Sequence, residues 1–108
     1  MKTVYVAGPL TKGNLYANTK AAVEAGDRLW KAGLLPFVPH AISMGEFICP
    51  KEYEDAMRYD FAWLKKCDAL LRLPGDSPGA DREVSCALDL GIEVFRSEEN
   101  LIRWALST

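Results

Sequence analysis

Residues 69–90 read ALLRLPGDSPGADREVSCALDL and combine a strand, a turn and a helix in one short segment. The apolar run 69–73 is typical of a buried strand, and residues 80–90 have the spacing of a helix. Ser77 and Gly79 fall in the turn between them, where backbone N–H groups are free to hold an anion. Glu83 follows one turn into the helix. In parallel α/β sheets ligands bind at the edge formed by the carboxyl ends of the strands, where this turn is expected. The segment therefore predicts an anion site beside a candidate nucleophile.

Strands and helices alternate along the rest of the chain. Segment 40–49 has no clear period and is expected to be a loop with at most a short helical turn, after which Pro50 suits the first turn of a helix. The alternation predicts an α/β fold, with a four- to five-stranded parallel sheet between two layers of helices, in a single domain over residues 1–108. The expected elements are strands at 3–7, 34–38, 69–73 and 92–95 and helices at 15–32, 51–66, 80–90 and from 98 onward.

Composition restricts the class of protein. The 108 residues are 49% hydrophobic and 26% charged, with a net charge of −2, which is typical of a soluble globular protein and gives no basic footprint for a nucleic acid polymer or a membrane. No apolar stretch approaches the ~20 residues that span a bilayer, and the first residues indicate a strand rather than a signal peptide. The three cysteines have no C-x-x-C spacing, which favours buried, reduced thiols in a cytoplasmic protein over a metal site.

Asp60 lies on the apolar side of the helix expected at 51–66. It follows Met57 by three residues and precedes Leu64 by four, so it falls on the stripe that these residues form. A carboxylate that faces the core must be paired, hydrogen-bonded or protonated. Two interpretations remain open: a structural Asp that accepts bonds from a loop, or a site acid whose pKa is raised by burial.

Glu83 makes a similar case on the next helix. The residues expected to be buried there are Ala80, Val84, Ala87 and Leu88, and Glu83 lies at the edge of their stripe. As a first-turn acid, Glu83 would complement the helix dipole. As a site residue it would be a nucleophile or general base at the edge of the sheet. The spacing alone leaves both interpretations open.

Other candidates follow the first two strands. The Tyr5 hydroxyl could reach the same edge of the sheet, or Tyr5 could be a core residue with one satisfied O–H. Gly8 and Pro9 open the next loop, which is neither a Walker A nor a G-x-G-x-x-G sequence. Lys12 could contact an anion or simply be solvated. His40, the one histidine, could line the pocket or have a structural role.

These residues together resemble the nucleoside 2-deoxyribosyltransferase superfamily. The resemblance rests on the start Val4-Tyr5-Val6-Ala7-Gly8-Pro9, on Asp60, on Cys67-Asp68-Ala69-Leu70-Leu71, and on Ser77-x-Gly79-x-x-x-Glu83. It covers nearly the whole chain and is nearest to a branch of small phage and bacterial proteins often described only as a domain of unknown function. It implies a flavodoxin-like, Rossmann-like three-layer fold and cleavage of the bond between a base and (deoxy)ribose.

The resemblance also implies roles for particular residues. Glu83 takes the place of the family's nucleophile, which forms an ester with the anomeric carbon, and Tyr5 takes the place of the tyrosine that orients it. Asp60 takes the place of the acid that protonates or contacts the base. We therefore expect an ionised Glu83 and an Asp60 that is protonated or shared with the leaving base. No metal or redox cofactor is implied.

The residue six positions before the glutamate separates two branches of this superfamily. Deoxyribosyltransferases carry an Asp there, whereas the similar 2′-deoxynucleoside 5′-phosphate N-hydrolases carry a Ser that binds the 5′-phosphate. Ser77 favours a nucleoside monophosphate as substrate, although a shift of one residue would place Asp76 there. The first loop departs from the hydrolase pattern, because Pro9 and Thr11 stand where those enzymes carry a Ser and an Arg.

Three functional hypotheses follow. The first is an N-glycosidase that acts on a (deoxy)nucleoside 5′-monophosphate, with Gly8, Pro9, Lys12, His40, Ser77 and Gly79 as its substrate-binding residues. The second is base exchange between deoxynucleosides, and the third is a nucleotide-sensing module without turnover. Relatives are commonly homodimers or larger assemblies, which the apolar residues Phe47, Trp63 and Trp104 would suit.

Overall fold

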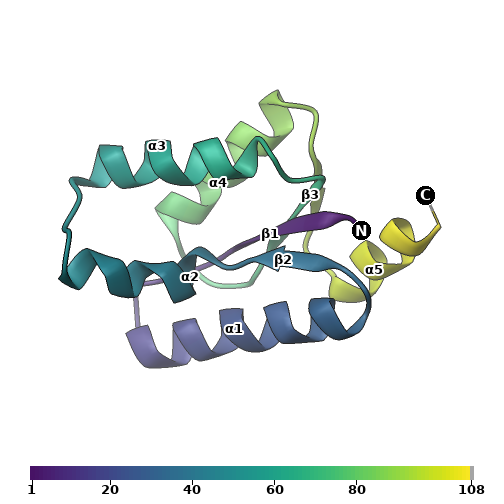
Figure 1. The fold of residues 1–108 in the computed structure, drawn as a ribbon, viewed down its shortest axis with the longest axis horizontal. Helices are drawn as coiled ribbons and strands as arrows, with labels where there is room; N and C mark the ends of the chain where they lie inside the picture. Colours follow the sequence, from purple (N-terminus) through teal and green to yellow (C-terminus); the bar gives the residue numbers. More distant parts are fainter. Residues whose placement is uncertain (108) are drawn as a thin grey trace.

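The computed structural model describes residues 1–107 and has the layered α/β architecture shown in Figure 1. Strands and helices alternate as the sequence predicts, and a short 3-10 helix, η1, follows α2. Along the described chain the order is β1 Thr3–Ala7, α1 Leu15–Lys31, β2 Leu35–Phe37, α2 Pro39–Ile42, η1 Ser43–Phe47, α3 Tyr53–Leu64, β3 Ala69–Arg72, α4 Pro78–Asp89, β4 Glu93–Phe95 and α5 Glu98–Leu106.

The sheet has four parallel strands in the order β2-β1-β3-β4. Thr3 of β1 lies opposite Leu35 of β2, and Val4 lies opposite Ala69 of β3 on the other side. The chain leaves β1 toward β2 and later crosses back to form β3, so the strand order reverses between β1 and β3. At such a switch point the connections diverge and leave a crevice beyond the carboxyl ends of the strands.

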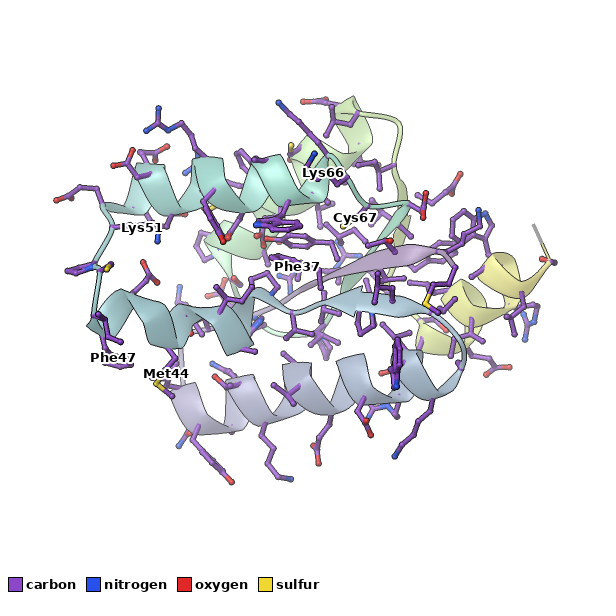
Figure 2. The ribbon with its side chains drawn as sticks, in the orientation of Figure 1. Phe37, Met44, Phe47, Lys51, Lys66 and Cys67 are labelled. Atoms are coloured by element: carbon purple, nitrogen blue, oxygen red, sulfur yellow. The ribbon has the colours of Figure 1, made fainter. Side chains whose placement is uncertain are left out.

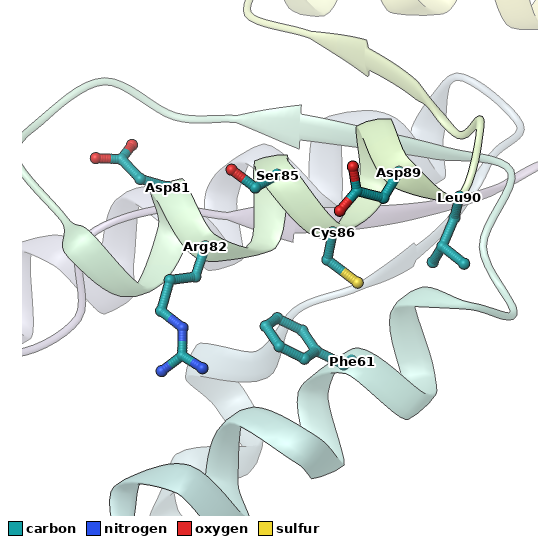
Figure 3. A pocket seen from close by; sticks show the side chains of 7 residues that line it. All are labelled: Phe61, Asp81, Arg82, Ser85, Cys86, Asp89 and Leu90. Atoms are coloured by element: carbon teal, nitrogen blue, oxygen red, sulfur yellow. The ribbon is translucent and has the colours of Figure 1, made fainter.

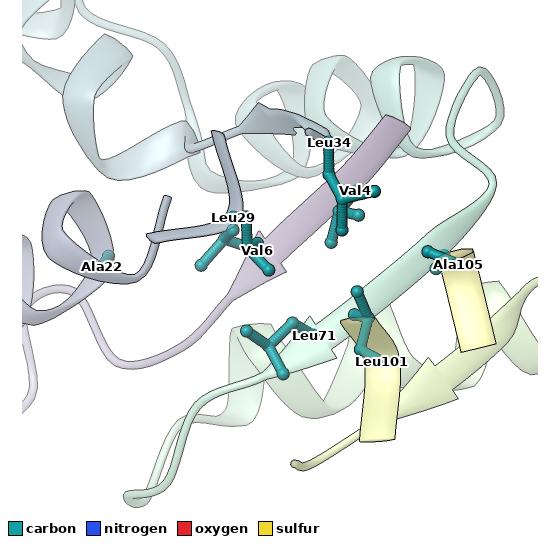
Figure 4. Packing of buried hydrophobic residues seen from close by; sticks show 9 residues of the cluster. Val4, Val6, Ala22, Leu29, Leu34, Leu71, Leu101 and Ala105 are labelled. Atoms are coloured by element: carbon teal, nitrogen blue, oxygen red, sulfur yellow. The ribbon is translucent and has the colours of Figure 1, made fainter. Parts of the chain in front are cut away.

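Two hydrophobic clusters hold the layers together. Helices α1 and α5 cover one face of the sheet, and α3 and α4 cover the other (Figure 1). Side chains of β1 alternate between the faces: Val4 and Val6 pack with Leu29 and Leu101 (Figure 4), whereas Tyr5 belongs to the cluster of α3 and α4. This alternation directs the Tyr5 side chain toward the same face as α4.

Glycines end α1 and α4, the helices that lead into β2 and β4. Gly33 has a φ of +93° after α1, and the Leu34 N–H reaches back to the Leu29 carbonyl at 3.0 Å, which closes a Schellman motif. Gly91, with a φ of +74°, ends α4 in the same way. An L side chain is strained at such a φ. The ends expected for the helices at 15–32 and 80–90 are confirmed to within one residue, at Lys31 and Asp89.

The segment after β2 differs from the prediction. Pro39 begins α2, in which the Ala41 N–H bonds to the Val38 carbonyl at 3.1 Å, and η1 continues the helical path to Phe47. Each helix is too short to show a hydrophobic period in the sequence. Pro50 lies outside the next helix, because α3 begins at Tyr53.

Two expectations about burial are wrong. Leu88 is 63% exposed, because the buried stripe of α4 follows Ala80, Glu83 and Ala87 and so leaves Leu88 on the outer side. Cys49 is an exposed thiol in the connection between η1 and α3, outside the core. Within residues 1–107 no helix combines the length and the apolar composition needed to cross a membrane.

Candidate active site

A cavity of about 730 Å³ lies at the carboxyl edge of the sheet. Segments far apart in the sequence meet there: the loop after β1, the α2–η1 segment, α3 and the start of α4. Among the residues predicted for the site, Tyr5 and Pro9 lie outside the lining. The predicted residues that line the cavity are Gly8, Lys12, His40, Asp60, Ser77, Gly79 and Glu83.

Glu83 lies at the wall of this cavity and is held from behind by Tyr5. The Tyr5 hydroxyl donates a short hydrogen bond to Oε2 of Glu83, and the tyrosine side chain is fully buried. A carboxylate complements the helix dipole in the first turn. Because α4 begins at Pro78, Glu83 lies beyond that turn. The arrangement therefore favours the site interpretation of Glu83 over the dipole interpretation.

Burial sets the protonation of Glu83. Only 7% of the residue is exposed, and this burial is the main reason that its pKa rises to about 7. The bond from Tyr5 lowers the pKa, the Asp60 carboxyl raises it, and the Arg72 guanidinium lowers it. Near neutral pH, Glu83 is therefore present in both protonation states.

Asp60 lies on α3 and is half-buried in the same cavity. Its pKa rises to about 6, mainly because of burial; Glu46 contributes to the rise, and Lys51 opposes it. The sequence predicts an ionised Glu83 beside a protonated Asp60, but in this structure Glu83 has the higher pKa. The order is reversed mainly because Glu83 is more deeply buried, whereas Lys51 favours the charged form of Asp60.

The buried Glu83 carboxyl should make stability depend on pH. Its pKa rises from 4.5 to about 7 on folding. Between these pH values the carboxyl ionises in the unfolded chain but stays protonated in the folded protein, so the free energy of unfolding falls as the pH rises, and the loss is complete above pH 7. We expect Glu83→Gln to raise the free energy of unfolding by roughly 3 kcal/mol more at pH 8 than at pH 4. Urea denaturation at both pH values, with the exposed Glu52→Gln as control, measures this. An equal gain at both pH values contradicts it.

Ser77 begins α4 and has two roles open to it. Its Oγ accepts a hydrogen bond from the Ala80 N–H at 3.1 Å, which caps the helix. The hydroxyl proton remains available as a donor. Because Pro78 has no N–H and Ala80 is bonded to the cap, Gly79 alone among these three offers its backbone N–H to the cavity. The predicted anion cradle is thus smaller than the sequence suggests.

Lys12 and Asp76 form an exposed ion pair across the mouth of the site. The Lys12 ammonium lies 2.8 Å from Oδ2 of Asp76. Lys12 lines the cavity, whereas Asp76 does not. Ser77 is buried and lines the cavity, so its position favours Ser77 over Asp76 as the residue of the candidate site.

His40 is 5% exposed and lies against the loop after β1. Its Nε2 is 2.9 Å from the Pro9 carbonyl, and its Nδ1 has no partner among the described residues. Burial lowers the pKa of His40, although the backbone carbonyls of Pro9 and Gly8 oppose this effect. A neutral ring that donates from Nε2 has an acceptor at Nδ1. His40 therefore supports the loop that contains Pro9 and also lines the cavity. Pro9 does not line the cavity and contacts the site through the bond of its carbonyl to His40.

Several residues that line or support the cavity are not predicted from the sequence. Glu46 and Lys51 line it and influence Asp60, and Figure 2 shows Lys51 beside the connection into α3. Glu46 lies in the segment 40–49, which has no clear period, and Lys51 was expected in the helix at 51–66, whereas α3 begins at Tyr53. Arg72 falls within the apolar run 69–73 of the sequence, and the structure buries it at the end of β3. A charged residue in that run was the available signal, because buried charges require partners.

A second depression lies between α3 and α4 (Figure 3). It is open and contains Phe61, Cys86 and the exposed side of Arg82, whose guanidinium is paired with Glu54. None of the carboxyls with pKa values raised toward neutrality lies there. We therefore place the candidate active site in the cavity at the edge of the sheet.

Comparisons with known proteins support the fold. The model of a family described as Domain of unknown function (DUF4406) matches residues 2–96. A solved structure, the 2-deoxyribosyltransferase from the psychrotolerant bacterium Bacillus psychrosaccharolyticus, matches with a TM-score of 0.66 at 20% identity, over 85% of this chain and 69% of that chain. No curated protein matches the chain. At this identity the structural likeness establishes the flavodoxin-like fold, which confirms the predicted fold class.

Proposed function

This chain belongs to the DUF4406 family, and we propose that it cleaves the N-glycosidic bond of a (deoxy)nucleoside 5′-monophosphate and releases the free base. The observation that carries the proposal is the buried hydrogen bond from Tyr5 to Glu83 in a cavity that Asp60 shares. Two carboxyls with pKa values near 7 and 6 can exchange protons at neutral pH. The resemblance of the motif and the deoxyribosyltransferase fold point to the same chemistry.

In the proposed first step, the ionised Glu83 attacks the anomeric carbon as the bond from this carbon to the base nitrogen breaks. The transition state has oxocarbenium character, and the carboxylate stabilises its developing positive charge. Asp60, in its protonated form, transfers a proton to the leaving base. The products are a free base and a sugar ester of Glu83.

In the second step, water attacks the anomeric carbon of the ester and returns its proton to Asp60. Glu83 leaves as a carboxylate, and the Tyr5 hydroxyl stabilises its charge by the hydrogen bond seen in the structure. The base exchange of a transferase would replace this water with a second base. The cavity is accessible to water and to a second base, so the ratio of hydrolysis to base exchange must be measured.

The 5′-phosphate is proposed to lie at the start of α4. The Ser77 hydroxyl and the Gly79 N–H are donors there, and the Lys12 ammonium is at the mouth. The positive end of the α4 dipole also favours an anion. The ion pair between Lys12 and Asp76 would have to open, or share its ammonium, when phosphate binds.

Ser77→Asp tests this phosphate assignment. Aspartate is as good a helix cap as serine, so the fold should be retained, but its charge should repel the phosphate. We expect kcat/KM for monophosphates to fall at least about tenfold further than kcat/KM for the corresponding nucleosides. Ser97→Asp, at the equivalent cap of α5, is the matched control for helix stability. Equal losses for both substrates would exclude phosphate contact at Ser77.

The function itself is tested by chromatography of the purified protein after incubation with deoxynucleosides and their monophosphates, each with and without a second free base. Release of free base from the monophosphates supports the proposed hydrolase. A new nucleoside that forms only when a base is added identifies a transferase. If no substrate is converted but calorimetry detects monophosphate binding, the sensing module is the correct function.

A further inference from the structure

Arg72 is a buried cation beneath the candidate active site. It is the last residue of β3 and only 5% exposed, yet it does not line the cavity. Alternation along β3 sends Arg72 toward the same face as Leu70, which packs in the cluster of α3 and α4. A buried guanidinium is costly unless its N–H groups are bonded, so its partners indicate what it does.

The Arg72 guanidinium bonds to both ends of the connection between β3 and α4. One amino group donates to the Leu73 carbonyl, and the other donates to the Gly75 carbonyl at 2.9 Å and to Oδ1 of Asp81 at 3.0 Å. Asp81 lies in the first turn of α4. One planar side chain thus connects the end of the strand, the turn and the start of the helix.

The turn that Arg72 holds is also in contact with the loop after β1. Gly75 has a φ of +117°, and a Cβ there would lie 2.7 Å from Cγ of Pro9. The Leu73 N–H bonds to the Ala7 carbonyl at 2.8 Å. The position of the turn is therefore fixed on two sides, and Ser77 follows immediately after it.

We propose that Arg72 is a positioning residue, which uses its forked guanidinium to fix the β3–α4 turn and so place Ser77 and the Gly79 N–H for an anionic group of the substrate. The proposal rests on the proposed function for the identity of that group. Two amino groups of one guanidinium donate to the three acceptors, and a lysine ammonium, with its single nitrogen, does not reproduce this forked set of donors. The charge of Arg72 has a second effect, since it lowers the pKa of Glu83 against the opposing influence of burial.

Two substitutions separate these effects. Arg72→Lys keeps the charge and loses the fork, whereas Arg72→Met loses both. We expect Arg72→Lys to raise KM for the monophosphate about 10- to 100-fold with a smaller change in kcat, because the anion contacts are displaced. In Arg72→Met, the acidic limb of the pH profile should also move to higher pH. The groups that face Glu83 and enter this profile are Tyr5, Asp60 and Arg72.

NMR tests the positioning role of Arg72 without any need for turnover. In 15N-labelled protein we expect the amide signals of Gly75 and Gly79 to shift or broaden in Arg72→Lys, while Arg58→Met, at an exposed pair on α3, leaves them unchanged. Unchanged signals together with an unchanged KM would overturn the positioning role. If Arg72→Met does not fold, Asp81→Ala removes one of the three acceptors of the guanidinium and should give a smaller change in the same signals. Altered signals in a protein without glycosidase activity would retain the positioning role and refute only the proposed function.

Discussion

Glu83→Ala should reduce glycosidic cleavage by at least about 10³-fold while the protein stays folded. The reason is that Glu83 is the proposed nucleophile, and no other carboxylate in the cavity is bonded to Tyr5. The measurement is release of free base from a deoxynucleoside monophosphate, with circular dichroism to check the fold. Monophosphate binding should persist, because Ser77, Gly79 and Lys12 are unchanged.

The control for this variant is Glu46→Gln, which also removes a carboxylate from the lining of the cavity but not from the tyrosine pair. We expect its effect on kcat to be far smaller. Covalent trapping adds a second criterion: a 2′-fluorinated substrate should label Glu83 in the native protein and leave Glu83→Ala unlabelled. Activity of Glu83→Ala within tenfold of the native protein would remove Glu83 as the nucleophile.

Asp60→Asn is expected to lower kcat by about 10²- to 10⁴-fold, the usual contribution of a general acid. The amide cannot transfer a proton to the leaving base or take one from water. Since Asp60 is only half-buried on α3, its loss should change the melting temperature little. A substrate with a better leaving base should recover much of the lost rate, whereas a purely structural role of Asp60 would predict equal losses for all bases.

The pH profile gives an independent test of the pair. The proposed mechanism requires an ionised Glu83 and a protonated Asp60, whose pKa values are about 7 and 6. Activity should fall below the first value and above the second, so kcat/KM should peak between pH 6 and 7, with apparent values that belong to the coupled pair. Asp60→Asn should abolish the basic limb and leave a residual rate that rises with pH to a plateau. A native profile that is flat from pH 5 to 8 would contradict this assignment.

Much of the fold follows from sequence because local rules and the global topology agree. The buried strand at 69–72, the glycines at 33 and 91, and the cap at Ser97 each have a local signal of known physical origin. The α2–η1 segment could not be predicted in the same way. Helices of four or five residues are stabilised by their neighbours rather than by their own period.

The candidate site was predictable in part. Asp60 and Glu83 are recognisable in the sequence because each carboxylate lies on or beside the apolar stripe of a helix. A carboxylate buried there must be paired, hydrogen-bonded or protonated, and such exceptions to the pattern are expected at functional sites. The order of their pKa values was not predictable, since it depends on the relative depth of the two carboxyls and on Lys51, which comes from another segment. The bonds of Arg72 across the turn likewise require coordinates, because the sequence gives no direction for a long side chain.

The buried Glu83 carboxyl also has a consequence for engineering. Ionisation of this buried carboxyl is unfavourable, so the catalytic role that we propose for Glu83 lowers the stability of the folded protein. Directed evolution for heat resistance alone should therefore favour neutral residues at this position. In a library selected for stability at alkaline pH, variants that keep Glu83 should be lost first, because ionised Glu83 destabilises the fold. Stabilising substitutions should therefore be sought on the exposed outer faces of the helices.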